Sequence, residues 1–135
     1  MFQFVHSVEY VIRNLDDTVA YMEKTFRMKP VKFAKDKRGT VEADYVVGTT
    51  QIRFMQPAPG GAAAEFLEKN GPGVYRVAWG TDDIPEAARQ LKASGATIKY
   101  EQGFQLHPGG YRSTLISGED SPVGLRFELA ELAKQ

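Results

Sequence analysis

The sequence predicts an α+β domain built from two pseudosymmetric modules, each a strand, a helix and three more strands. The segment SVEYVIRNLDDTVAYMEKTF, which starts at Ser7, aligns without a gap with RVAWGTDDIPEAARQLKASG, which starts at Arg76. A single module of this size would struggle to bury a core, so two copies are expected to pack as a pair. Pairing edge to edge favours a curved, cup-shaped mixed sheet with the helices on the outer face.

The second copy defines its helix most clearly. Asp83 is an N-cap acceptor, Pro85 falls in the first turn and Gly95 marks the end. Between these signals, four apolar residues recur at helical spacing: Ile84, Ala87, Ala88 and Leu91. In the first copy Asn14 aligns with Asp83, which predicts a helix from Asp16 to about Phe26.

Strands are predicted by alternation of apolar and polar residues, most clearly from Phe4 to Ile12. Further strands are expected at residues 31–33, 42–47, 50–55, 74–80, 97–102, 113–117 and 125–129, and a short helix at 64–69. We expect one domain over residues 1–135, with module one at about 4–57, a crossover at about 58–72 and module two at about 73–132.

The amino-acid composition excludes several classes of partner and of chemistry. The 135 residues are 42% hydrophobic, which is enough for a real core. Seventeen basic and seventeen acidic side chains leave no net charge, so neither nucleic acid nor an anionic membrane is an expected partner. The absence of cysteine excludes disulfides and thiolate chemistry. No apolar run reaches membrane-spanning length and the N-terminus lacks a signal-peptide pattern, so a cytoplasmic location is expected.

Alternation also sorts charged residues onto one face of the predicted sheet, opposite the helices. That face collects Ser7, Glu9, Arg53, Met55, Arg76, Ala78, Arg126 and Glu128. Buried charges need partners, so the three arginines and two glutamates either pair with one another or are completed by a ligand. The surplus of one positive charge predicts a small anionic organic ligand, such as a carboxylate or phosphoryl group. The alternative is a face open to water that carries ordinary surface ion pairs.

The doubled module, with NLDDTVAYMEKTF in one half and DDIPEAARQLKASGA in the other, resembles the vicinal oxygen chelate superfamily of glyoxalases, bleomycin resistance proteins and extradiol dioxygenases. The second half is most similar to methylmalonyl-CoA epimerase, through EFLEKNGPGVYRVAWGTDDI, HPGGYRSTLI and PVGLRFELAE. The resemblance implies four metal-ligand positions, which fall on Ser7, Arg53, Arg76 and Glu128. Only Glu128 matches a ligand type, so no metal and no other cofactor is expected.

On this basis Glu128 and Glu9 are the expected catalytic residues, acting in proton transfer. The expected substrate-binding residues are Arg53, Arg76, Arg126, Ser7, Met55, His107 and Tyr111. His6 is predicted to face the helices rather than a ligand. Glu42 and Asp44 fall on a strand where the resemblance places a catalytic glutamate.

Three functions follow from these expectations. The first is a metal-independent isomerase or lyase acting on a small carboxylated or acyl-thioester substrate. The second is a non-catalytic binding protein of the bleomycin-resistance type. The third is a metal-dependent lyase or dioxygenase with relocated ligands, for which Glu9, Glu128 and His107 are the candidates. A homodimer is expected in each case, because members of the superfamily often pair.

Overall fold

The computed structural model describes residues 1–99, 105–106, 112–116 and 123–131. It divides into two compact units. The first unit comprises residues 7–75, and the second comprises residues 1–6 together with the described residues from Arg76 onward. No helix in the described ranges is long and apolar enough to cross a membrane.

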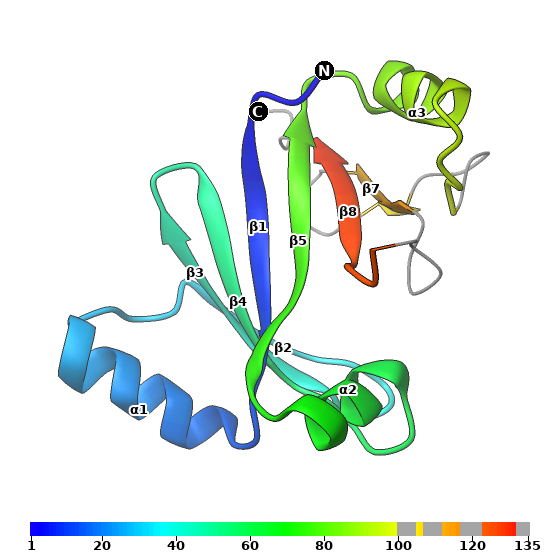
Figure 1. Ribbon diagram of the computed structural model, residues 1–135. Helices are drawn as coiled ribbons and strands as arrows, with labels where there is room; N and C mark the ends of the chain where they lie inside the picture. Colours follow the sequence, from blue (N-terminus) through cyan, green and yellow to red (C-terminus); the bar gives the residue numbers. More distant parts are fainter. Residues whose placement is uncertain (100–104, 107–111, 117–122, 132–135) are drawn as a thin grey trace. The chain divides into compact units, whose positions relative to one another are not determined.

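The first unit forms one βαβββ module. Its elements are β1 (Phe4–Val11, from Ser7 onward), α1 (Leu15–Phe26), β2 (Lys32–Lys35), β3 (Val41–Val47), β4 (Thr50–Gln56) and α2 (Ala62–Asn70). The strands follow the order β2-β3-β4-β1. Figure 1 shows β3, β4 and β1 next to one another. β1 is parallel to β4, and the other neighbours are antiparallel.

The second unit repeats this plan. Its elements are β5 (Gly73–Thr81, from Arg76 onward), α3 (Ile84–Ala93), β6 (Gln105–Leu106), β7 (Arg112–Ile116) and β8 (Phe127–Glu131). The order is β5-β8-β7-β6, with β5 parallel to β8 and the remaining pairs antiparallel. The predicted α+β class and the two βαβββ modules are therefore confirmed. The boundaries proposed for a single domain stay a prediction.

Residues 1–6 belong to the second unit because they run beside β5. The amide of Gln3 donates a hydrogen bond to the carbonyl of Gly80 at 3.0 Å. The ring of Phe4 lies over Gly80, where a Cβ atom would come within 2.4 Å of the ring carbons. A larger residue at this point of β5 would therefore require the Phe4 ring to move.

Both long helices begin as the repeat predicts. Asn14 accepts a hydrogen bond from the amide of Asp17 at 2.9 Å, and Asp83 accepts one from Glu86 at 3.1 Å. A second cap, absent from the predicted repeat, comes from the last strand of each module. Gln56 accepts from the amide of Leu15 at 2.8 Å, and Glu131 accepts from that of Ile84 at 3.4 Å.

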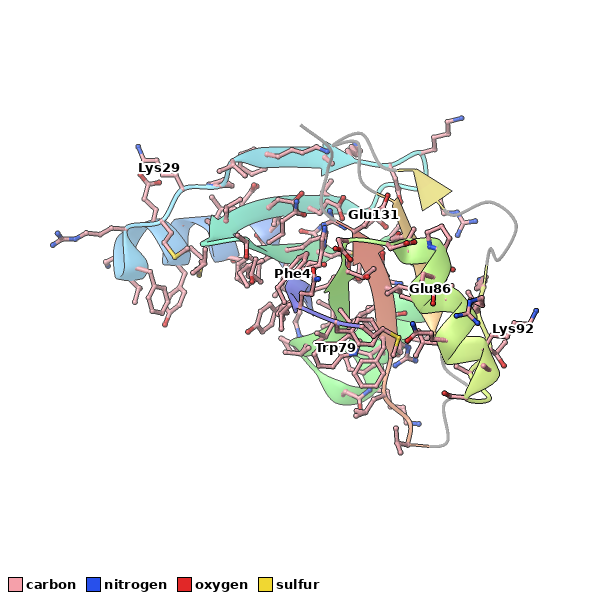
Figure 2. All side chains as sticks on the ribbon, turned by 90° about the horizontal axis from the view of Figure 1, so that it is seen from above. Phe4, Lys29, Trp79, Glu86, Lys92 and Glu131 are labelled. Carbon is pink, nitrogen blue, oxygen red and sulfur yellow. The ribbon has the colours of Figure 1, made fainter. Side chains whose placement is uncertain are left out.

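Each unit has its own core between helix and sheet. In the first unit α1 packs on the face of the sheet that carries Ile12, Ala43, Tyr45 and Phe54. In the second unit α3 packs on Leu129, with partly buried Trp79, Phe127 and Phe2 around it. Figure 2 places Trp79 and Phe4 in this second unit. The apolar residues that pack on the helix of their own unit are Tyr10, Ile12, Ile52 and Phe54 in the first unit and Trp79, Phe127 and Leu129 in the second.

One boundary prediction was wrong. Leu125, expected in the last strand, precedes β8 and is 56% exposed, because pairing with β5 begins only at Phe127. Of the strand expected at 97–102, residues 97–99 are described and form a single bridge at Ile98, whereas residues 100–102 lie outside the described ranges.

Tyr45 offers a test of the first core. Its side chain is fully buried against Phe54, with ring centroids 5.5 Å apart. Its hydroxyl has no hydrogen-bond partner in the described structure. A buried, unpaired hydroxyl costs free energy, so Tyr45→Phe is expected to raise the free energy of unfolding by about 1 kcal/mol. Urea denaturation measures this change, and a loss of stability would show that the hydroxyl is bonded.

Candidate functional site

A row of charged side chains crosses three strands of the first unit. Register pairs Glu9 of β1 with Arg53 of β4, and pairs Arg53 with Asp44 of β3. Phe54 lies on the opposite face, in the core against α1. Because side chains alternate along a strand, the row occupies the face turned away from α1, as the sequence predicts for Glu9 and Arg53.

Arg53 is the centre of this row. Its Nε lies 2.8 Å from Oδ1 of Asp44, and its Nη2 lies 3.3 Å from Oδ2, which gives a two-point contact. The Oε2 atom of Glu9 lies 3.6 Å from Nη1, and that of Glu42 lies 3.5 Å from Nε. We call these four residues the Arg53 cluster. Within this cluster one guanidinium faces three carboxylates, and Lys32, opposite Asp44 in register, adds a second positive charge that acts on Glu42.

Glu42 differs from the other two carboxylates of the Arg53 cluster. Its side chain is 24% exposed, against 8% for Glu9 and 9% for Asp44. Burial raises the pKa of Glu42 above its usual value; Arg53 opposes this shift, and the charges of Asp44 and Glu9 add to it. Glu42 is thus the carboxyl that is both reachable from solvent and inclined to hold a proton.

The second unit carries a separate ion pair. Arg76 on β5 places Nε 3.3 Å from Oε2 of Glu128 on β8. The two side chains are 25% and 16% exposed. Arg126 immediately precedes β8, and its carbonyl accepts a weak hydrogen bond from the amide of Val77 at 3.5 Å. Pairing between arginines and glutamates, one of the two outcomes weighed from the sequence, therefore occurs in each unit.

The other predicted residues fall in several places. Met55 lies two positions along β4 from Arg53, on the same face, and is 9% exposed. Ser7 lies two positions before Glu9 on β1 and also shares that face. His6 is buried, and its ring centroid lies 6.3 Å from that of Phe4. His107 and Tyr111 lie outside the described residues.

Sequence reasoning missed that Glu42 and Asp44 surround Arg53, although a signal existed. Gly48, at φ 62°, helps form the two-residue turn between β3 and β4, and the turn pairs Val47 with Thr50. Counting three residues outward from that pair places Asp44 opposite Arg53. The sequence analysis did not use this count to align the two strands, and it therefore did not predict that Glu42 and Asp44 lie beside Arg53.

Comparison with known proteins agrees with this doubled architecture. The family model of the Glyoxalase/Bleomycin resistance protein/Dioxygenase superfamily matches residues 6–112. The chain belongs to this superfamily. A search of curated proteins by sequence finds no match.

Among solved structures, a variant methylmalonyl-CoA epimerase of Streptomyces coelicolor in complex with 2-nitronate-propionyl-CoA is similar to this superfamily member, with a TM-score of 0.85, 22% identity, and coverage of 98% of this chain and 96% of the other. The epimerase of Mycobacterium tuberculosis gives a TM-score of 0.85 at 24% identity, with coverage of 98% and 90%. A selenomethionine methylmalonyl-CoA epimerase gives 0.83 at 26% identity, with coverage of 99% and 98%.

The residues at the four positions that the sequence resemblance assigned to metal ligands do not fit a divalent cation. Two of the four positions hold Arg53 and Arg76, whose guanidinium groups offer no lone pair and carry positive charge. Both guanidinium groups are in ion pairs with carboxylates of their own unit. Across the described residues, no cluster of three acidic or histidine side chains has the geometry to hold a metal ion.

Proposed function

We propose that this superfamily member is an isomerase that moves a proton at the carbon next to the carbonyl of a small acyl thioester, without a metal ion. The observation that carries the proposal is the position of Glu42 beside the guanidinium of Arg53. A partly buried carboxyl with a raised pKa is suited to act as a base near neutral pH. An adjacent fixed cation can stabilise the negative charge that forms on oxygen.

In the proposed step, the carboxylate of Glu42 removes the proton from the α-carbon. The electron pair of the C–H bond forms a carbon–carbon double bond, and the carbonyl electrons move to oxygen to give an enolate. The two-point contact with Asp44 holds the guanidinium of Arg53 in a fixed orientation toward this oxygen. Inversion requires a second acid that delivers a proton to the opposite face of the α-carbon, for which Glu9 in its carboxylic acid form is the candidate. Return of the proton from Glu42 restores the original configuration, and exchange with solvent resets the two carboxyl groups.

A substrate carboxylate bound at this position would add a negative charge to a cluster that already holds three carboxylates around Arg53. Formation of the enolate adds none, because Glu42 loses its negative charge when it takes the α-proton. The solved epimerases support the substrate class, since their titles name complexes with 2-nitronate-propionyl-CoA and methylmalonyl-CoA. Glu128, paired with Arg76 in the second unit, stays a prediction from the sequence for proton transfer.

A non-catalytic binding protein is the second candidate. It is favoured by the ion pairs themselves, because Arg53 and Arg76 have carboxylate partners within the protein and need no substrate to compensate them.

Proton exchange in deuterium oxide separates the two functions. Protein dialysed against a chelator is incubated with methylmalonyl-CoA or propionyl-CoA, and deuterium at the α-carbon is followed by mass spectrometry. Enzyme-dependent incorporation without added metal is the expected result. Binding of the thioester without exchange would support sequestration. Exchange that appears only after addition of cobalt, nickel or manganese would contradict the metal-free mechanism.

A further inference from the structure

Basic residues are concentrated in one short segment of the first unit. Residues 27–38, RMKPVKFAKDKR, contain six basic residues and one acidic residue, in a chain with no net charge. We call these residues the basic segment. It includes β2, the edge strand of the first unit's sheet, and the turn that follows it. Such charge asymmetry indicates an anionic ligand or partner.

Several cations of the basic segment are available to solvent. Lys35, Lys37 and Arg38 are exposed, and within the described residues no carboxylate lies in ion-pair distance of them. The single acid, Asp36, is engaged by the turn, since its carboxylate accepts hydrogen bonds from the amides of Arg38 at 2.8 Å and Thr40 at 3.0 Å. Lys29 differs, because it projects from the loop after α1 and pairs with Glu23 at 3.7 Å (Figure 2).

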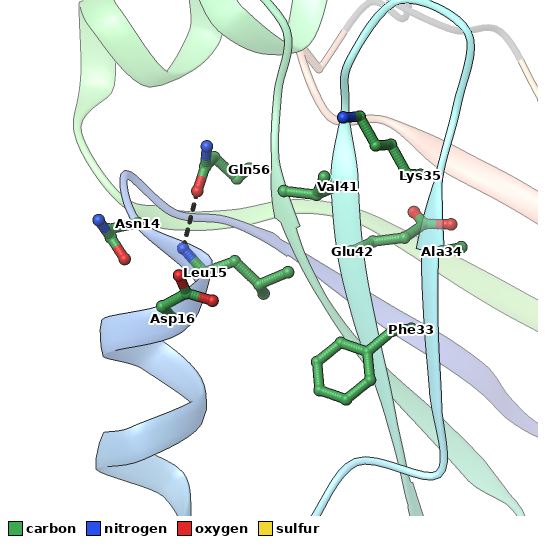
Figure 3. A pocket seen from close by; sticks show the side chains of 9 residues that line it. All are labelled: Asn14, Leu15, Asp16, Phe33, Ala34, Lys35, Val41, Glu42 and Gln56. Atoms are coloured by element: carbon green, nitrogen blue, oxygen red, sulfur yellow. Dashed lines mark hydrogen bonds between the residues drawn. The ribbon is translucent and has the colours of Figure 1, made fainter.

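A pocket of about 530 Å³ lies beside this segment, between the start of α1 and strands β2 and β3 (Figure 3). Its apolar lining includes Leu15, Phe33 and Val41. Phe33 is 61% exposed, so its ring offers an open face to a flat ligand. Pockets of this size accommodate small organic molecules.

Polar groups of the pocket favour a particular orientation of the ligand. Gln56 and Asn14 use their side-chain oxygens to cap α1, and their side-chain NH₂ groups are hydrogen-bond donors that the caps do not use. Asp16 lies at the α1 end, where it disfavours an anion. Glu42 also borders the pocket, but alternation with Val41 directs its carboxylate to the opposite face of β3, toward Arg53. Lys35 lies at the other end, next to the turn that carries Lys37 and Arg38.

We propose that this pocket binds the base of a nucleotide-type ligand against Phe33, and that Lys35, Lys37 and Arg38 bind its phosphate groups. The inference rests on the proposed function in one respect: an acyl thioester carried by coenzyme A would bring such a nucleotide. In such a complex the phosphate groups would bind at the basic segment, and the uncharged thioester would bind at the Arg53 cluster.

Adenosine 3′,5′-bisphosphate is the probe, because it has the base and phosphates of coenzyme A but no thioester. Titration calorimetry at low ionic strength is expected to detect binding that weakens with added salt. Lys35→Ala/Lys37→Ala is expected to weaken binding by about tenfold to a hundredfold, and Phe33→Ala by about tenfold. The matched control is Lys24→Ala/Lys69→Ala, which removes the same charge from exposed positions on α1 and α2 and is expected to bind as the unmodified protein does.

Different experimental results would contradict this inference and the proposed function. Equal affinity of the two double variants would overturn the inference. So would inorganic pyrophosphate binding as tightly as the nucleotide with no effect of Phe33→Ala, since that result describes a plain anion site. Proton exchange on a propionyl-pantetheine thioester, together with no binding of the bisphosphate, would leave the function standing without this site. Bisphosphate binding without any proton exchange would leave the site standing without the function.

Discussion

Glu42→Gln is expected to lower the rate of α-proton exchange by about 10²- to 10⁴-fold, because the amide cannot accept the proton. The structural cost is small, since the side chain is nearly isosteric and 24% exposed. Glu68→Gln on the exposed face of α2 is the matched control and is expected to exchange protons at the unmodified rate. A Glu42→Gln protein that exchanges protons normally would exclude Glu42 as the base.

The raised pKa of Glu42 determines how both the rate of proton exchange and the free energy of unfolding change with pH. The exchange rate is expected to fall as pH decreases through the raised pKa, so the acid limb of the profile lies above the ordinary carboxyl range. Between the pKa of Glu42 in the unfolded state and its higher pKa in the native state, the native protein holds the carboxyl proton more often than the unfolded chain does. The contribution of Glu42 to the free energy of unfolding therefore decreases as pH rises toward the native pKa. Glu42→Gln removes this dependence, which urea denaturation over a pH series measures.

Arg53→Met is expected to lower the free energy of unfolding by about 2–4 kcal/mol at pH 7. The substitution leaves the carboxylates of Glu9, Glu42 and Asp44 together without their central cation, and two of them are less than 10% exposed. The loss is expected to shrink as the pH approaches 4, because protonated carboxyls no longer repel one another. Urea denaturation at both pH values tests this difference.

Arg53→Lys is the informative comparison, because it keeps the charge but lacks the planar fork that contacts Asp44 at two points. Its stability is expected to lie between those of the unmodified protein and Arg53→Met. A change of less than about 0.5 kcal/mol in Arg53→Met would show that solvent or residues outside the cluster already compensate these carboxylates.

The fold was predictable because its signals are local and occur twice. Asn14 and Asp83 cap helices in the same phase, and the structure retains both caps. The turn at Gly48 and the apolar alternation of β4 also survive unchanged. The last strand was the weakest part of the prediction: Leu125 fits the alternation, but the start of β8 depends on pairing with β5, which is a long-range contact.

The candidate site was predictable only in part, for a related reason. Alternation placed Glu9 and Arg53 on one face, because side-chain direction is a property of a single strand. The partners of Arg53 depend on how three strands align, and this alignment brought Asp44 and Glu42 to its guanidinium.

The sequence by itself determined the doubled module, the two capped helices and the polar face of each strand, since residue type and periodicity set these features within a few turns or strands. Only the tertiary structure decided the composition of the Arg53 cluster, the pairing of Arg76 with Glu128 and the pocket beside β2. The physical reason is that ion pairs and cavities depend on distances of a few ångströms between residues far apart in the chain, and strand register and helix packing set those distances.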